Sequence, residues 1–400
     1  MKPPKAVLPL AFLALLAAAS GAAESPSAPI EITHGGTYSG HWTSNDAKVP
    51  AVTIRTDEPV VLRNSTVSGR GNLIVIAGVK SGANVTVENV TGTALDPGLA
   101  GAPRGSFVSA GNFNALTVDH CTIEGTMFGI KAVGANPTVL RITNNVGRNL
   151  EDRASDGHGG LLPQRPGLGH FVLLNHVAAV EGAEIAWNES MQAIGSTSTE
   201  DVINMYESSG APGHPIHVHD NYMEGASTAV PGKNYTGTAM IADGNSAPNA
   251  MPTAWVLFEN NLVVATAGTG VGIAYGHDIT ARNNRIVSCG EDAAGHKYAW
   301  GASAVVIWNY YKVPGFYNNT ITGTTGGMVA PGPNHQPRAA DAWLGPGSPP
   351  DASNAIRDNQ FTDPCLVGGK VNLRAEDEER ARWKEKLAKA RETVGAGHGR

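Results

Sequence analysis

Residues able to exchange protons or contact a sugar recur at outward positions of five apolar segments between residues 128 and 311. Successive side chains of a strand point to opposite faces, so alternate positions share one surface. The outward set is Lys131, Asn204, Tyr206, Asp243 and Trp308, with Glu207 and His277 at strand ends and Asn309 and Tyr310 directly after Trp308. We expect Glu207, Asp243 and His277 to lie on successive coils, about 5 Å apart per step.

These residue types suit chemistry on a sugar polymer. Two carboxylates about 5 to 9 Å apart can serve as acid and base in glycoside hydrolysis. A lyase or epimerase would instead use Lys131, Tyr206 or His277 to remove a proton beside a uronate carboxylate. The catalytic candidates are therefore Asp243, His277, Glu207 and Lys131, and the substrate-binding candidates are Tyr206, Asn204, Trp308, Asn309 and Tyr310. The competing interpretation is an ordinary solvent-facing surface, because polar clusters are only probabilistic evidence of a site.

Two further motifs contain residues that bind metals. His217 and His219 share one face of a strand and, with Asp220, offer three ligands of the kind that zinc or copper takes. No fourth ligand is evident, so an exposed histidine pair is the favoured interpretation. Residues 151–160 are rich in Asp, Glu and Gly but lack the regular spacing of a calcium loop. We therefore predict no metal site. The sequence does not identify a cofactor; Ca²⁺ is compatible with it, but no calcium motif is evident.

A repeat must position these residues. A strand, an Asn, one further residue and an apolar residue recur, with the apolar residue at 67, 90, 123, 146, 177, 223, 263, 286, 321 and 361. The spacing of 23 residues occurs three times, and a fixed period in the low twenties indicates a solenoid. Between 147 and 200 the register is ambiguous, because Met191 follows Val177 by only 14 residues and both resemble the repeat.

The solenoid predicted by this repeat is a stack of β-strand coils. Each coil is too short to fold alone, whereas stacked coils bury a column of Val, Ile and Leu and pair their strands in parallel, about 4.8 Å apart. The recurring Asn suits a sharp turn, because Asn tolerates a left-handed backbone and its side chain can bond its neighbour in the next coil. The predicted fold class is all-β, a right-handed parallel β-helix with a short C-terminal α-helix.

Two phrases then carry a family resemblance. Gly129-Ile130-Lys131-Ala132 and Gly272-Ile273-Ala274-Tyr275 are each followed by an Asn-x-Ile turn phrase. In these features the chain resembles the right-handed parallel β-helix superfamily of pectate lyases, alginate epimerases and periplasmic copper-maturation proteins, over about residues 30–370. The resemblance implies the fold. It does not choose an activity, because this superfamily includes lyases, hydrolases, esterases, epimerases and proteins without catalysis.

The ends of the chain differ from its middle. Lys2 and Lys5 precede an apolar run and the small residues 20–23, which is the pattern of a secretory signal peptide over residues 1–23. The expected organisation is this signal, a β-helix domain over 24–370 and a charged helical tail over 371–400. Acidic residues come first in the tail and basic residues last, as a helix dipole favours. Its thin apolar stripe, Trp383, Leu387, Ala390 and Val394, predicts a helix that caps the last coil or lies loose.

Five insertions rich in Gly, Pro, Asn and Asp are expected to form loops over one face: about 94–110, 150–168, 226–252, 291–301 and 326–353. The three cysteines, Cys121, Cys289 and Cys365, allow at most one disulfide, and buried free thiols are the favoured interpretation.

Composition limits the partners. A net charge of -6 with 16% charged residues argues against nucleic acid, which requires concentrated Lys and Arg. After removal of the signal, no segment is long and apolar enough to span a membrane. We therefore expect a secreted or periplasmic protein that acts on an extended polysaccharide as a lyase, epimerase or hydrolase. The alternative is a non-catalytic glycan-binding or surface β-helix protein. The sequence does not choose the polymer or the oligomeric state.

Overall fold

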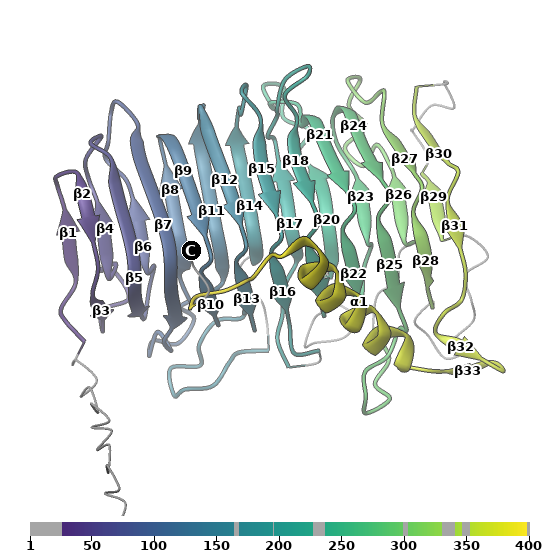
Figure 1. Ribbon diagram of the computed structural model, residues 1–400, viewed down its shortest axis with the longest axis horizontal. Helices are drawn as coiled ribbons and strands as arrows, with labels where there is room; N and C mark the ends of the chain where they lie inside the picture. Colours follow the sequence, from purple (N-terminus) through teal and green to yellow (C-terminus); the bar gives the residue numbers. More distant parts are fainter. Residues whose placement is uncertain are drawn as a thin grey trace, which may run out of the picture.

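The computed structural model describes residues 26–163, 168–194, 196–226, 237–298, 303–329, 341–345 and 353–397. The predicted signal peptide, residues 1–23, lies outside these ranges. The described chain forms an elongated stack of coils, with strands that run side by side from one end to the other (Figure 1). All strand pairings along the stack are parallel, and one short antiparallel pair, β32 (Leu366–Val367) and β33 (Lys370–Val371), follows it.

One face of the stack is an eleven-stranded sheet. Its strands, in spatial order, are β1 (Ile30–Ile32), β4 (Val52–Ile54), β6 (Ile74–Ile76), β8 (Ser106–Gly111), β11 (Phe128–Ala135), β14 (His170–Val177), β17 (Asp201–Tyr206), β20 (Thr238–Asp243), β23 (Val271–Ile273), β26 (Val305–Ile307) and β29 (Ala342–Leu344). Each strand is separated from the next in this sheet by a full coil, so residues far apart in the sequence become neighbours.

The rest of the wall is a twenty-stranded sheet with two rows. The upper row contains β2 (Gly36–Tyr38), β9 (Phe113–Asp119), β12 (Val139–Thr143), β15 (Ala183–Ala186), β18 (Ile216–His219), β21 (Ala254–Glu259), β24 (His277–Arg282), β27 (Thr320–Thr322) and β30 (Ala355–Arg357). The lower row contains β3 (His41–Ser44), β10 (Thr122–Glu124), β13 (Val146–Arg148), β16 (Glu189–Met191), β19 (Tyr222–Glu224), β22 (Leu262–Val264), β25 (Arg285–Ser288), β28 (Thr325–Met328) and β31 (Gln360–Phe361). The long strands β5 (Val60–Gly69) and β7 (Ala83–Ala94) belong to both rows.

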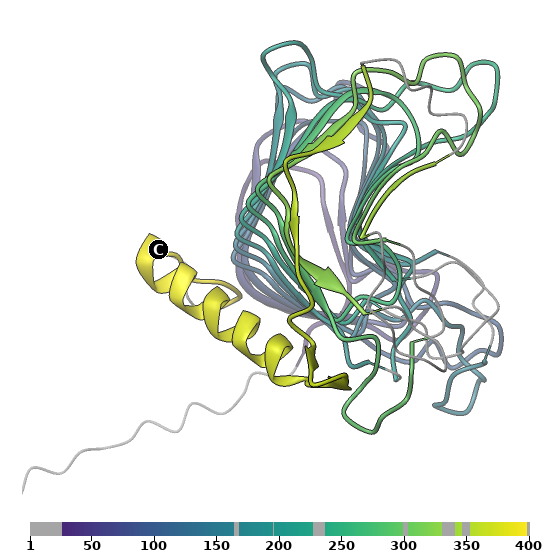
Figure 2. The same cartoon turned by 90° about the vertical axis from the view of Figure 1, so that its right-hand side faces the viewer.

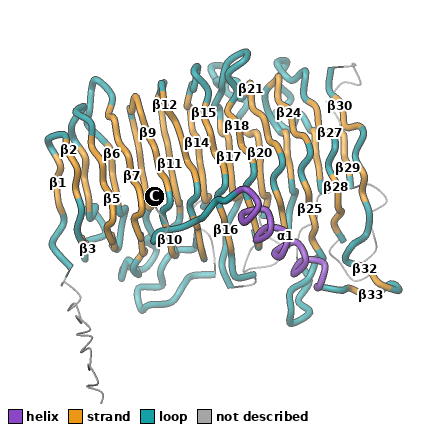
Figure 3. Tube along the Cα trace, viewed as in Figure 1, coloured by secondary structure: helices purple, strands orange, loops and turns teal. Residues whose placement is uncertain are grey.

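The interior between the sheets is one apolar core that extends from Ile32 to Met328 and consists mainly of Val, Ile, Leu and Ala. Inward residues alternate with outward ones along the strands, as in β21, where Val256 and Phe258 are buried and their neighbours are partly exposed. The predicted fold class, an all-β parallel β-helix with one C-terminal helix, is confirmed. Figure 3 shows the same arrangement of strands with a single helix outside them.

The recurring Asn has the predicted structural role, and two successive residues share that role. The first residue adopts the left-handed backbone, with φ of 58° at Asn144 and 56° at Asn260. The second forms a buried ladder up the stack, in which each side-chain amide donates to the carbonyl oxygen of the next. The bonds join Asn145, Asn188, Asn221, Asn261 and Asn284 at 2.9 to 3.0 Å.

The coil register corrects several predicted markers. The positions that pair in one column are Val67, Gly92, Ile123, Gly147, Ser190, Met223, Val263, Ile286, Gly326 and Phe361. Val177 was the wrong marker, because it ends β14 in the eleven-stranded sheet, and β16 supplies that coil instead. Ile321 was also wrong, because its strand belongs to the upper row. Asn318 and Asn319 thus mark a different corner of the coil.

The insertions were only partly predicted. The described parts of 150–168 and 291–301 are loops with isolated bridges. The other three ranges were drawn too long, because they take in strands of the eleven-stranded sheet: 94–110 overlaps β8, 226–252 contains β20, and 326–353 contains β29. An end view shows that most long loops lie on the side of the stack away from the helix (Figure 2).

The C-terminal helix α1 (Arg374–Ala390) neither caps the last coil nor lies loose, so both predictions for it were wrong. It lies across the outside of the lower row, against β22 and β25, and residues 391–397 continue back toward earlier coils (Figures 1 and 2). Trp383 is 1% exposed and stacks on Tyr222 with ring centroids 5.7 Å apart. Leu387 and Val394 join the same cluster, whereas Ala390 is exposed.

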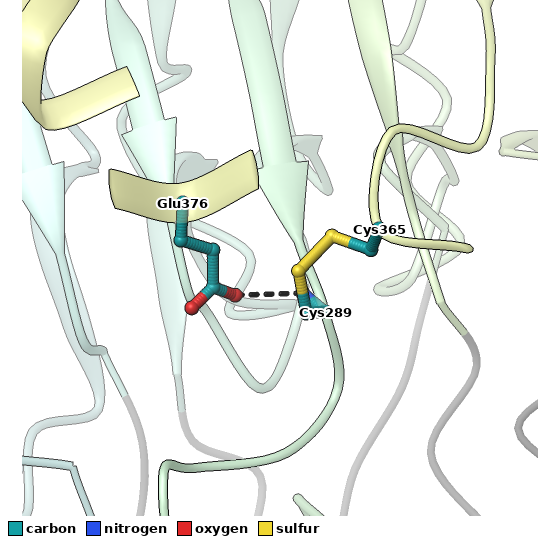
Figure 4. A group of neighbouring side chains, drawn as sticks. All are labelled: Cys289, Cys365 and Glu376. Carbon is teal, nitrogen blue, oxygen red and sulfur yellow. Dashed lines mark hydrogen bonds between the residues drawn. A yellow bond between two sulfur atoms is a disulfide. The ribbon is translucent and has the colours of Figure 1, made fainter. Parts of the chain in front are cut away.

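Ion pairs fix this C-terminal strap, residues 372–397, and one disulfide lies beside its start. Arg380 pairs with Glu224, Glu379 with Arg285, and Lys386 with Asp220. Cys289 and Cys365 form a disulfide beside the start of the helix, where Glu376 accepts the Cys289 backbone N–H at 2.7 Å (Figure 4). One bridge is the maximum that we predicted, but the favoured interpretation of three free thiols was wrong. Cys121 alone of the three is a buried thiol.

Candidate functional site

The eleven-stranded sheet carries a cleft of about 560 Å³ on its outer surface, over β17, β20, β23, β26 and β29. Strand pairing sets two outward columns there. One runs Asn204, Ile241, Gly272, Val306 and Trp343, and the other runs Tyr206, Asp243, Ala274 and the Trp308 position after β26. Because the side chains of Gly272 and Ala274 are small or absent, the cleft is deep between Asp243 and the aromatic residues beyond it.

Asp243 lies at the acidic end of the cleft and is largely buried. Its Oδ1 accepts a hydrogen bond from the Tyr311 hydroxyl at 2.8 Å and from the Gly244 backbone N–H at 2.8 Å. Its Oδ2 accepts from the side-chain amide of Asn204 at 3.4 Å. Burial raises the pKa of Asp243, although these three donors favour the carboxylate and oppose the shift. The predicted outward position of Asp243 is confirmed.

Asp201 is a second acid in the cleft, which the sequence analysis missed. Its Oδ2 accepts from the same Asn204 amide nitrogen, at 2.9 Å. Burial raises the pKa of Asp201 well above its usual range, and the negative charges of Glu200 and Asp243 raise it further. The available signal was the Glu200-Asp201 pair at the start of the strand that carries Asn204 and Tyr206.

A single amide therefore bridges two carboxyl groups. Because both Oδ2 atoms contact the Asn204 nitrogen, at 2.9 Å and 3.4 Å, they cannot be farther apart than those two distances combined. That limit concerns the two nearest oxygen atoms, and it is compatible with the roughly 5 to 5.5 Å between the carboxyl groups of retaining glycosidases. Mutual repulsion between two buried acids favours a state with one proton between them.

Aromatic rings form the other end of the cleft. Trp308 contacts Trp343 with centroids 5.1 Å apart and Tyr310 with centroids 4.7 Å apart. Tyr310 is 53% exposed and Trp343 is 39% exposed, so their rings present free surface. Tyr311 connects the two ends, because its ring contacts Tyr310 and its hydroxyl bonds Asp243. Of the predicted binding residues, Trp308 and Tyr310 thus line the cleft with Asp243.

The other two residues predicted on these columns have distinct settings. Asn204 is buried and its amide positions both acids, so Asn204 affects the site by holding Asp201 and Asp243 in place. Tyr206 lies in register with Asp243, and its hydroxyl accepts from Asn245 at 2.9 Å. Burial raises the pKa of Tyr206, and the nearby negative charges of Glu207 and Asp243 add to the shift. Its phenol is therefore hard to ionise.

Glu207 was predicted to lie beside Asp243 on the outward surface, but it does not face the cleft. It sits at the corner after β17 with a left-handed φ of 46° and is 1% exposed. His176 contacts its carboxylate at 2.9 Å, and the Met251 backbone N–H donates to it at 3.1 Å. The amide of Asn245 bonds it too. These contacts give Glu207 the role of a clamp on the loop after β20.

Lys131 and Asn309 are also apart from the acids. Lys131 lies on the same outward column as Asn204, but β14 separates their strands, and its ammonium sits 4.7 Å above the Phe128 ring. Asn309 is 7% exposed. Its side chain exchanges two hydrogen bonds with the Val313 backbone, so it shapes the loop that carries Tyr310 and Tyr311.

His277 lies on another sheet from Asp243, which corrects the predicted grouping. It begins β24 in the upper row of the twenty-stranded sheet, where it pairs with Ala254. Its ring stacks on Tyr317 with centroids 4.7 Å apart and bonds Asp278 at 2.7 Å. The prediction failed because His277 follows a corner at Gly276, so it belongs to the next face of the coil.

The histidine pair His217 and His219 has its rings 4.0 Å apart on the upper row. Burial opposes the charge, but hydrogen bonds to Asp220 and Glu184 raise the pKa of His219 to about 9. A protonated imidazole has no lone pair for a metal. Burial and the neighbouring charge of His219 lower the pKa of His217. The two histidines therefore form part of a charge network with Glu184 and Glu259.

Two groups of potential metal-binding side chains occur among the described residues. One is Cys289, Cys365 and Glu376, where the disulfide occupies both sulfurs (Figure 4). The other is His170, Glu200 and Asp201 beside the cleft. The His170 Nδ1 atom lies 3.1 Å from the Asp201 backbone carbonyl, and Nε2 lies 3.7 Å from Glu200. These contacts link the histidine to the acidic end of the cleft.

Comparison with known proteins leaves the activity open. Neither the protein-family models nor the curated proteins include a match to this chain. Among solved structures, the chain is similar to the crystal structure of the Dettilon tailspike protein, with 14% sequence identity and a TM-score of 0.42. The alignment covers 85% of this chain and 62% of that one, so this chain spans less than two thirds of that protein's length. The parallel β-helix fold implied by the sequence resemblance is confirmed by the strand pairing itself.

In the part of the chain that the structure describes, α1 is too short and too polar to cross a lipid bilayer.

Proposed function

We propose that this protein is exported and hydrolyses a polysaccharide in the cleft of the eleven-stranded sheet, with Asp201 and Asp243 as the catalytic carboxyl groups. The observation that carries the proposal is the pair of buried acids bridged by Asn204 at one end of a cleft whose other end is aromatic. Aromatic rings stack on sugar faces, and paired carboxyl groups are the usual machinery of glycoside hydrolysis.

The geometry assigns different roles to the two acids. Asp201 is the more deeply buried and has its pKa raised by burial and by two neighbouring charges, so it retains a proton for the glycosidic oxygen. Asp243 accepts three hydrogen bonds, which suit a carboxylate, and attacks the anomeric carbon as the C–O bond breaks. Water, deprotonated by Asp201, then hydrolyses the glycosyl ester and returns both groups to their initial states.

The same positions disfavour the other two reactions that we considered. Lyases and epimerases need a base beside the carbon that loses its proton. His277 is on another sheet, and Lys131 lies two strands from Asn204 with its ammonium on a phenyl ring. Tyr206 remains, but its raised pKa makes the phenolate scarce. Hydrolysis is the reaction that the placed residues serve best.

The test is release of reducing ends from a panel of amylose, mannan, galactomannan, xyloglucan, polygalacturonate and alginate. Asp201→Asn and Asp243→Asn should each lower turnover of the polymer that is cleaved by a factor on the order of 10² or more, with an unchanged melting temperature. His277→Ala is the matched control on the other sheet and should retain turnover. Full activity in both Asn variants would refute the acid pair.

A binding protein without catalysis is the second candidate, favoured by the exposed aromatic surface of Tyr310 and Trp343. Such a protein would retain one polymer of the panel in affinity electrophoresis and release no reducing ends from it. Trp343→Ala should weaken that retention, whereas Asp243→Asn should not.

Export is supported by the Cys289–Cys365 disulfide, because disulfides persist mainly in oxidising compartments. The test is fractionation of cells that express residues 1–400 or residues 24–400. The full chain should appear outside the cytoplasm without residues 1–23, and its two cysteines should resist alkylation until reduced. Retention of the full chain in the cytoplasm, with Cys289 and Cys365 reactive without reduction, would contradict export.

A further inference from the structure

The charges that line the cleft are all of one sign. Among the described residues, its lining includes three acids, Glu200, Asp201 and Asp243, and no lysine, arginine or histidine. Because Asp201 keeps its proton, the negative charges are those of Glu200 and Asp243, and Asp243 is mostly buried, so water screens its charge poorly. Any ligand in the cleft therefore meets a negative potential at its acidic end.

The nearest basic side chains lie outside the lining of the cleft. His170 is 3% exposed and lies beside Glu200 and Asp201, at 3.7 Å and 3.9 Å, but is not among the lining residues. Lys131 is two strand spacings from Asn204, about 10 Å, and its ammonium rests on the Phe128 ring. Apart from the three acids, the polar and aromatic groups that line the cleft are neutral: the tyrosine hydroxyls, Thr269 and the aromatic rings.

We infer that the cleft selects an uncharged polysaccharide and rejects chains that carry carboxylate or sulfate groups. The inference rests on the proposed function and narrows its substrate class. A uronate in the cleft would place its charge beside those of Glu200 and Asp243, with no basic residue in the lining to pair with it, and an unpaired buried charge is costly. A neutral sugar needs only hydroxyl partners and a flat apolar surface, which Trp308, Tyr310 and Trp343 supply.

The first test is the identity of the polymer that the panel above reveals. A neutral chain is the expected substrate, and preferred cleavage or retention of polygalacturonate or alginate would overturn the inference. The neutral substrate is then oxidised at its primary alcohols, which converts a fraction of its sugars to uronates on the same backbone. We expect at least a tenfold loss of turnover, and of retention in affinity electrophoresis, with the loss smaller at high salt.

Glu200→Gln provides the matched variant, because it removes one charge without a change in size. It should narrow the preference for the neutral over the oxidised chain by several-fold. Glu88→Gln, on the twenty-stranded sheet, is the control and should leave the preference unchanged. Equal use of both chains by the unmodified protein would refute charge selection.

Binding and cleavage distinguish the two proposals. Retention of a neutral polymer without any cleavage would refute hydrolysis and would leave the charge preference measurable by retention alone. Cleavage of an acidic polymer would refute the charge selection and keep the hydrolase. Absence of both binding and cleavage across the panel would refute the proposed function and the inference with it.

Discussion

Asn221 shows how much one residue of the ladder contributes. It is 1% exposed, and its amide donates to the Ile185 carbonyl and to Asn261, while its carbonyl oxygen accepts from the backbone and side chain of Asn188. Truncation leaves buried partners on both sides unsatisfied, and each costs about 1 to 3 kcal/mol.

We therefore expect Asn221→Ala to lower the free energy of unfolding by at least about 3 kcal/mol, summed over those partners. The measurement is denaturant unfolding followed by circular dichroism. Asn84→Ala is the control, because Asn84 makes one exposed bond to the Asp57 carbonyl and should change stability by well under half as much. Equal losses in the two variants would show that the ladder adds no special stability.

Tyr311 is a positioning residue whose effect should appear in the pH profile. Its hydroxyl donates to Asp243 and so opposes the rise in the pKa of that acid. Turnover requires ionised Asp243 and protonated Asp201, so it falls as pH drops through the first pKa and as pH rises through the second. Tyr311→Phe should move the acidic limb of kcat/KM to higher pH. An unshifted limb with a lower plateau would indicate a purely structural role.

At the scale of elements, the sequence was sufficient for the strands and turns and insufficient for their register. Apolar alternation and Asn phrases are local, so they revealed the coils, and they placed Asp243 and Trp308 on one outward surface. They did not reveal which corner an Asn marks. The column residues Val263 and Ile286 are 23 apart, whereas Gly147 and Ser190 are 43 apart. Asp201 and Asp243 meet only because a coil of that longer kind separates them, so no local pattern pairs them.

The helix gives the same lesson about long-range contacts. Its charge order and its stripe of Trp383, Leu387 and Val394 were readable, but its partners Tyr222, Glu224 and Arg285 lie far back in the sequence. An amphipathic stripe predicts that a helix packs against something and does not identify the surface. The two predicted placements, a cap on the last coil and a loose tail, were therefore both wrong.

Glu376 makes the attachment of this element depend on pH. Burial raises its pKa from 4.5 to about 7, although the Cys289 N–H favours the charged form. The folded protein thus holds a proton that the unfolded chain loses near pH 4.5, so stability should fall as pH rises from about 4.5 to 7 and level off above. Glu376→Gln keeps the acceptor and should flatten that slope, with a gain of up to about 3 kcal/mol at pH 8. Melting curves at several pH values test this, and an unchanged slope would contradict it.

At the scale of the whole molecule, the stack separates stability from the proposed chemistry. The strap covers the lower row of the twenty-stranded sheet, whereas the cleft opens on the eleven-stranded sheet, and the apolar core lies between them. The disulfide joins residues 289 and 365, so it survives when the chain is ended after Leu373. Coils of a solenoid depend mainly on their neighbours, and each coil beneath the cleft would remain paired.

Ending the chain after Leu373 should therefore lower the melting temperature, because Tyr222 and Leu262 lose their cover. Below that temperature, turnover of the preferred polymer should stay within about twofold of that of the full chain, because no neighbour of the cleft is lost. Trp383→Ala tests the same point if the shortened chain is insoluble, since it removes the central contact of the strap and keeps the rest. Asp243→Asn is the opposite control, with turnover lost and melting unchanged. A folded strapless protein without turnover would show that the two faces are coupled through the core.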